Sequence, residues 1–164
     1  MAALTVTRLA AAIAFLVLAA PHAGDAQPVR TVVIGVLGGG SRAANAVNMD
    51  AFRQALRERG YVDGRSVRFE ERWAETRSER LPELAAELVR LGVDVIVAGG
   101  GTPAVLAAKG ATRELPIVFP TAGDPVGDKL VESLARPGGN VTGLSIMAQE
   151  LGPKRLELLS QTLR

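Results

Sequence analysis

The sequence predicts an α/β fold: a doubly wound parallel sheet of about five strands with helices on both faces. Short apolar runs rich in β-branched residues alternate along the chain with segments of helical periodicity. Most of these runs are apolar throughout, as in strands that are buried on both faces of a parallel sheet. We find no internal repeat and no low-complexity linker, and 138 residues would remain after the first 26, which suits one domain.

The first β-α pair is strongly patterned. Residues Thr31–Leu37 form an apolar run that predicts a buried strand, and a helix is expected over Ala44–Arg59 before Gly60. The residues expected on the buried side of this helix are Val47, Phe52, Ala55 and Leu56.

The second pair is more amphipathic. Apolar and charged residues alternate over Val67–Trp73, which predicts a strand that is more exposed than the first. A helix follows, with apolar residues at helical spacing, and Gly92 ends it. These apolar residues are Leu81, Leu84, Ala85, Leu88 and Leu91.

The remaining elements continue the alternation. Three further strands are expected, over Val93–Ala98, Leu115–Phe119 and Val141–Leu144. Three further helices are expected, over about Pro103–Ala111, Pro125–Leu134 and Glu150–Leu163.

The first 26 residues have the layout of a secretory signal peptide. Arg8 precedes an apolar stretch over Leu9–Ala20, and Ala26 supplies a small residue for cleavage. The stretch is about a dozen residues long, short of the roughly 20 that span a bilayer. We therefore expect residues 1–26 to be removed, and residues 27–164 to lie in the periplasm with no stable membrane insertion.

Cysteine and histidine are scarce, which restricts the possible chemistry. The chain has no cysteine, and its single histidine, His22, lies in the expected signal. Triads that need histidine, and zinc sites of histidine and cysteine, are therefore not expected. A serine–lysine pair of Ser41 with Lys109, Lys129 or Lys154 stays open, although no spacing argues for it. We expect no catalytic residue, no metal and no cofactor.

The net charge is +2, and acidic and basic residues alternate along the expected helices. This pattern is typical of a solvated surface, and no stripe of one sign is present to follow a phosphate backbone. Nucleic acid is therefore not an expected partner.

Three strand exits are candidate site loops, because parallel sheets bind ligands at the carboxyl ends of their strands. They are Gly38–Ser41, Gly99–Pro103 and Thr121–Pro125. In the second and third loops, Thr102 and Asp124 are placed to cap helices that begin with proline. Backbone N–H groups and helix dipoles at this edge would favour a small anionic group such as a carboxylate. Trp73 ends the second strand near the same edge, and we interpret it as a packing residue.

Two other interpretations of the first loop are disfavoured. Gly38, Gly40 and Ala43 fit the dinucleotide pattern, but that site needs an acidic residue about 20 positions further on. Glu70 and Glu71 come about thirty residues later and should point to opposite faces of their strand. The same loop also resembles a nucleophile elbow around a serine, but the mature chain would lack the histidine base.

The sequence resembles the family of ABC transporter substrate-binding proteins that includes tryptophan- and tyrosine-type binding proteins. The resemblance rests on consecutive blocks over nearly all of the mature chain, which are "VIGVLGGGS", "FRQALRERGYVDGRSVRFEERWAE", "RLPELAAELVRLGVDVIVAGGGTPAVLAAKGAT", "LPIVFPTAGDPVGDKLVESLARPGGNVTGLS" and "KRLELL". It implies a type I periplasmic-binding-protein fold, in which two α/β lobes close on a solute. It also implies delivery of that solute to an inner-membrane ABC permease with its ATPase, without catalysis.

The resemblance also implies where a solute would bind. Carried over by position, the ligand-binding residues are Gly39, Gly40, Ser41, Gly101, Thr102, Pro103, Ala122, Gly123 and Asp124. Members of the family are about twice as long, so residues 27–164 are expected to be the N-terminal lobe, with the second lobe absent. The expected function is binding of a small organic solute, such as an amino acid or another carboxylate. A sensor module for a membrane receptor and, less favoured, a periplasmic enzyme are the alternatives.

Overall fold

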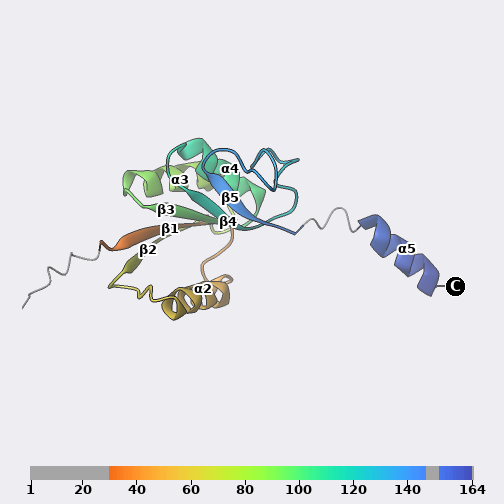
Figure 1. Cartoon of the computed structure of the whole chain (residues 1–164), viewed down its shortest axis with the longest axis horizontal. Coiled ribbons are helices and arrows are strands. Elements are labelled where there is room, and N and C mark those ends of the chain that lie inside the picture. Colours follow the sequence, from red (N-terminus) through yellow and green to blue (C-terminus); the bar gives the residue numbers. More distant parts are fainter. Residues whose placement is uncertain (1–29, 147–151, 164) are drawn as a thin grey trace, which may run out of the picture.

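The computed structural model describes residues 30–146 and 152–163, so the expected signal peptide lies outside the described residues. Strands and helices alternate along the described chain (Figure 1). The elements are β1 (Val32–Gly38), α2 (Ala46–Glu58), β2 (Val67–Trp73), the 3₁₀ turn η1 (Ser78–Arg80), α3 (Leu81–Arg90), β3 (Val95–Gly99), α4 (Thr102–Ala111), β4 (Ile117–Ala122), β5 (Val141–Ser145) and α5 (Gly152–Thr162). No helix in the described ranges is both long enough and apolar enough to cross a bilayer.

The five strands form one parallel sheet in the order β2-β1-β3-β4-β5. The chain first moves from β1 outward to β2, then returns to β3 on the other side of β1 and continues outward to β5. The direction therefore switches between β1 and β3, whose last residues, Gly38 and Gly99, are register partners. The predicted doubly wound parallel sheet of five strands is confirmed.

One face of the sheet packs on α3 and α4 (Figure 1). Alternate strand residues point to this face, and together with both helices they form the larger of the two buried clusters. Its largest fully buried side chains include Leu37, Leu88, Ile96 and Phe119. Arg72 on β2 joins this face to α3, since its Nε lies 2.7 Å from Glu87 Oε2.

The opposite face carries α2, which covers β1 and β2 (Figure 1). Its buried cluster is small and consists of Ile34, Val36, Met49 and Val67. Beyond α2 the same face of the sheet is open, and Val118 on β4 and Leu144 on β5 are 37% and 70% exposed. Helices on both faces are thus confirmed, but the two faces are covered to different extents.

The helix expected over Pro125–Leu134 is wrong. The segment after β4 forms turns and bends, and Lys129 has a positive φ of 55°, which interrupts helical geometry. Leu130 and Val131 are adjacent in sequence and are both buried against the α3–α4 face. Lys109 of α4 fixes this loop, because its Nζ donates to the carbonyls of Lys129 and Leu130 at 2.7 and 3.1 Å.

Several smaller expectations also need correction. Val47 is 80% exposed, and Met49 is the buried residue at the start of α2. The third strand begins at Val95 and not at Val93. Asp94, just before it, is bonded to Val33 twice, through its own N–H and through its carboxylate, which accepts from the Val33 N–H. The fourth strand begins at Ile117 and continues to Ala122, with a register shift after Phe119. The expected start of the last helix, Glu150, lies outside the described residues.

Candidate functional site

A crevice of about 520 Å³ opens where β1, β3 and β4 end, on the face of the sheet that carries α2. It lies at the point where chain direction switches, which is where ligands bind in open α/β sheets. Sixteen residues line it: Val36, Gly38, Gly39, Gly40, Asn45, Asn48, Met49, Ala51, Phe52, Trp73, Val97, Gly99, Gly100, Val118, Pro120 and Thr121.

The walls of this crevice are mainly apolar. Phe52 of α2, Trp73 of β2 and Val118 of β4 contribute side chains from three different elements. Polar groups are fewer, and the amides of Asn45 and Asn48 are on the α2 side. A concave apolar surface with a few polar groups suits a small organic molecule that has both an apolar part and a polar end.

Glycines at the first two strand exits are required by close packing. A Cβ on Gly38 would lie 2.0 Å from Cε3 of the Trp73 indole, so only glycine leaves room for that ring. Gly100 has a φ of +103°, and a Cβ there would lie 2.6 Å from the backbone nitrogen of Gly39. The Gly39 N–H donates to the carbonyl of Gly99 at 2.9 Å, which joins the first two exits.

The segment after β2 supports the same loop. The N–H groups of Ala74, Glu75 and Thr76 donate to the carbonyls of Gly38, Gly40 and Gly39 at 2.8, 3.2 and 3.1 Å. Glu75 and Thr76 adopt positive φ values of 51° and 66° to make these bonds. Backbone strain in non-glycine residues is retained only where the surrounding structure overdetermines it. Here the three hydrogen bonds fix residues 38–42, which we call the glycine loop.

Of the predicted binding residues, Gly39 and Gly40 line the crevice, and Ser41 follows them directly. Ser41 Oγ accepts a hydrogen bond from the Ala44 N–H at 3.2 Å, and the Ser41 carbonyl accepts one from Asn45 Nδ2 at 2.9 Å. Ser41 therefore organises the turn that precedes α2. Two of the three lysines that left a serine–lysine pair open have other contacts: Lys109 holds the loop after β4, and Lys154 pairs with Glu157 on α5.

The second predicted group lies at the start of α4 and does not line the crevice. Thr102 is not the N-cap, as the sequence suggested, because Gly101 holds that position with a φ of 86°. Pro103 occupies the first turn as expected. Thr102 Oγ1 instead donates to Asp128 Oδ2 at 2.6 Å, which ties α4 to the loop after β4.

The third predicted group is divided. Ala122 is buried as the last residue of β4, and Gly123 accepts a hydrogen bond at its carbonyl from Ser145 Oγ. Asp124 does cap, since its Oδ1 accepts from the Gly127 N–H at 2.8 Å, but it caps a turn and not a helix. This exit contributes Pro120 and Thr121 to the crevice instead.

Sequence reasoning missed most of the crevice walls. Trp73 packs on Gly38, as the sequence predicts, and it also lines the crevice. Asn45, Asn48 and Phe52 lie on one side of α2 at spacings of three and four residues, a pattern the sequence does show. The pattern was not interpretable in advance, because only the strand order shows which half of the sheet α2 leaves open.

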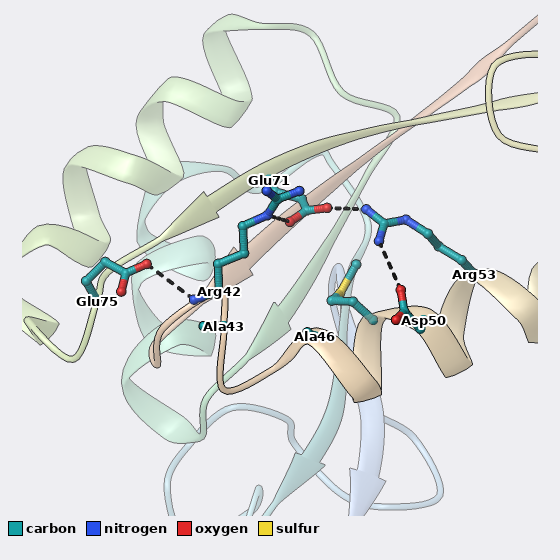
Figure 2. Close-up of a pocket in the computed structure, with 8 residues that line it drawn as sticks. Arg42, Ala43, Ala46, Asp50, Arg53, Glu71 and Glu75 are labelled. Carbon is teal, nitrogen blue, oxygen red and sulfur yellow. Dashed lines mark hydrogen bonds and ion pairs between the residues drawn. The ribbon is translucent and has the colours of Figure 1, made fainter.

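A carboxylate on β2 lies next to the crevice. Glu71 Oε2 accepts from Arg42 Nε at 3.0 Å, and Oε1 binds the Arg53 guanidinium (Figure 2). Oε2 also accepts from the Trp73 indole N–H at 2.9 Å. Burial alone would raise the pKa of Glu71. The hydrogen bonds from Trp73 and Arg42, together with the charges of Arg42 and Arg53, reverse this and hold the pKa below its ordinary value of 4.5.

Comparison with known proteins gives a consistent result. Residues 33–163 match the family described as "ABC transporter substrate binding protein". A curated relative, the tyrosine-binding protein of Clostridioides difficile strain R20291, is 37% identical over 94 residues, which are 57% of this chain and 27% of the relative.

Solved structures show the same fold. An ABC domain in complex with L-Trp from Streptococcus pneumonia is 34% identical, with a TM-score of 0.64 over 70% of this chain and 38% of that one. A conserved domain protein from Vibrio cholerae is also 34% identical, with a TM-score of 0.65 over 71% of this chain and 39% of that one. The chain therefore spans less than two-fifths of the length of these relatives.

Proposed function

The chain belongs to the ABC transporter substrate binding protein family, and from this premise we propose that it is the solute-binding component of an ABC importer in the periplasm. The solute we propose is an amino acid or a similar small carboxylate. Two similar proteins support this class, one named for tyrosine binding and the other solved with L-Trp.

The observation that carries the proposal is the crevice at the switch point. It combines apolar and aromatic walls with asparagine amides and glycine backbone at one edge. An amino acid side chain would lie against Phe52 and Trp73, while its charged end would face the exits of β1 and β3. We further propose that Gly39 and Gly40, which line the crevice, and the adjoining Ser41 contact the solute.

In this proposal the chain forms the N-terminal lobe of a two-lobed receptor. The solute is then held between the carboxyl edge of this sheet and a second lobe, and an inner-membrane permease with its ATPase receives it. The chain's part is recognition, and the proposal needs no catalytic residue.

A thermal-shift panel of free amino acids and small organic anions tests binding by the chain. A solute at about five times its Kd adds about 1 kcal/mol of stability, which raises Tm by roughly 4 °C. The variant Ala51→Phe should abolish this gain, because Ala51 is exposed on α2 and lines the crevice.

The matched control is Gln54→Phe, which adds the same ring to an exposed position of α2 outside the crevice lining. It should keep the full thermal shift. Absence of a shift with every compound, or equal loss in both variants, would contradict the proposal.

A further inference from the structure

Glu71 connects three parts of the molecule that surround the crevice. Its side chain is 11% exposed, and its two oxygens receive donors from the glycine loop (Arg42), from α2 (Arg53) and from the end of its own strand (Trp73). Figure 2 shows the carboxylate between the two guanidinium groups. A single carboxylate therefore links β2 to the glycine loop and to α2, which both contribute residues to the crevice lining.

The link to Trp73 is direct. The indole N–H donates to Glu71 Oε2 at 2.9 Å, while the opposite edge of the ring lies against Gly38. A ring held at its polar end by a charged acceptor, and packed against a backbone that lacks a side chain, has little freedom to rotate. One aromatic wall of the crevice thus depends on Glu71.

The link to Phe52 passes through Arg53. The Arg53 guanidinium binds Glu71 Oε1 and lies 5.1 Å above the centre of the Phe69 ring. Phe69 in turn contacts Phe52 edge-on, with ring centres 5.9 Å apart and planes at 74°. The second aromatic wall is therefore held through a cation–π contact and an aromatic pair.

The link to the glycine loop is made by Arg42. Its Nε donates to Glu71 Oε2, and its backbone N–H donates to Glu75 Oε1 at 3.2 Å (Figure 2). Arg42 follows Ser41 directly, so the same carboxylate fixes the loop that the proposed function places against the solute.

We infer that Glu71 is a positioning residue for the crevice. Before a solute arrives, Glu71 holds Trp73 directly, the glycine loop through Arg42, and Phe52 through Arg53. The inference rests on the proposed function, because it assigns a role in that same site. A wall that is already ordered loses less conformational freedom on binding, so its preorganisation strengthens affinity.

The substitution Glu71→Gln tests this role, because an amide has the shape of the carboxylate but not its charge. With its oxygen in the place of Oε2, the amide would still accept from Arg42 and Trp73, but as a weaker, uncharged acceptor, and its NH₂ group would face Arg53. Every contact of the carboxylate is then weakened or lost. The matched control is Glu87→Gln, which removes the carboxylate that binds Arg72 Nε at 2.7 Å on the other face of the same strand.

Two readouts separate positioning from stability alone. Trp73 is the only tryptophan in the chain, so its emission and its quenching by acrylamide report on this wall without any solute. Calorimetric titration with L-tyrosine reports on binding. For Glu71→Gln we expect more efficient quenching and roughly tenfold weaker affinity, as for loss of a charged hydrogen bond. Glu87→Gln should change neither.

Arg53→Lys provides a second variant if Glu71→Gln does not fold. Lysine keeps the charge but loses the planar group that lies over Phe69. We expect weaker affinity with Trp73 quenching unchanged, because the bond between Glu71 and the indole remains.

Unchanged quenching in a folded Glu71→Gln protein, or the same change in Glu87→Gln, would overturn the inference. Altered quenching with unchanged affinity would also overturn it, while the proposed function would stand. If the wild-type chain binds neither L-tyrosine nor any compound of the panel, the proposed function fails, and the quenching measurement alone decides whether Glu71 holds Trp73.

Discussion

The two faces of the sheet differ in how completely they are covered. On the face of α3 and α4, two helices and the loop after β4 bury a continuous cluster around Phe119 and Ile96. On the other face, α2 covers β1 and β2, while β4 and β5 keep exposed apolar residues beside the crevice. The comparison indicates that one face supplies most of the stability and that the other carries the binding surface.

Substitution of adjacent residues on β4 tests this division and should give the largest effect. Phe119 is 1% exposed on the α3–α4 face, so Phe119→Ala should lower the free energy of unfolding by about 3–5 kcal/mol. Val118 points to the crevice face and is 37% exposed, so Val118→Ala should cost less than about 1 kcal/mol. Urea denaturation measures both, and equal losses would contradict the division.

A second test compares two glycines that are register partners at the strand ends. Gly38→Ala would place a Cβ 2.0 Å from the Trp73 ring, and we expect a loss of about 1–3 kcal/mol with a shifted Trp73 emission spectrum. Gly99→Ala meets no atom within 4 Å and serves as the control. If both variants keep the wild-type spectrum, the packing of Trp73 on Gly38 is not as described.

The fold was largely predictable from the sequence, whereas the site was only partly so. The apolar run at β1 and the leucine spacing of α3 predict their elements directly, because burial on both faces of a sheet and on one face of a helix gives different periodicities. Capping residues were less informative. Thr102 and Asp124 have the sequence of helix caps, but the Thr102 hydroxyl binds Asp128, 26 residues away, and Asp124 caps a local turn through the N–H of Gly127.

The walls of the crevice depend on long-range register, which no local pattern shows. Trp73 lies against Gly38 because β2 pairs with β1 from Val67 opposite Val32 to the last residue of both strands. Likewise, the alternation of β2 places Glu71 on one face, but its two arginine partners, Arg53 and Arg42, lie 18 and 29 positions away in the sequence.

Acid should weaken the crevice face through Glu71. Its folded pKa is lowered, so its ion pairs stabilise the protein fully above its ordinary pKa of 4.5. This contribution is lost as the pH falls through the lower folded value. Urea denaturation between about pH 6 and 3 should therefore show a smaller decline for Glu71→Gln than for the wild type. Identical declines in the free energy of unfolding would mean that the ion pairs of Glu71 add no stability.

The smallest expected effect is on the well-covered face and raises stability. Gly110 is exposed in α4, and a Cβ there meets no atom within 4 Å. Gly110→Ala should add about 0.5–1 kcal/mol through its higher helix propensity, without altering solute binding. Thermal denaturation measures the gain in stability, and the thermal-shift panel measures solute binding. A solute-induced Tm shift that differs from that of the wild type would mean that the two faces are coupled.

The most direct measurement of where a solute binds is a two-dimensional NMR titration of the chain with L-tyrosine. We expect shifted amide signals at Gly38, Gly39 and Gly100 and a shifted Trp73 indole N–H, which is unambiguous because the chain has one tryptophan. Signals from α3 and from the buried residues of α4, Ala104, Val105 and Ala108, should not shift. Shifts confined to the α3–α4 face, with the signals of the three glycines and of the indole unchanged, would contradict the assignment of the binding surface.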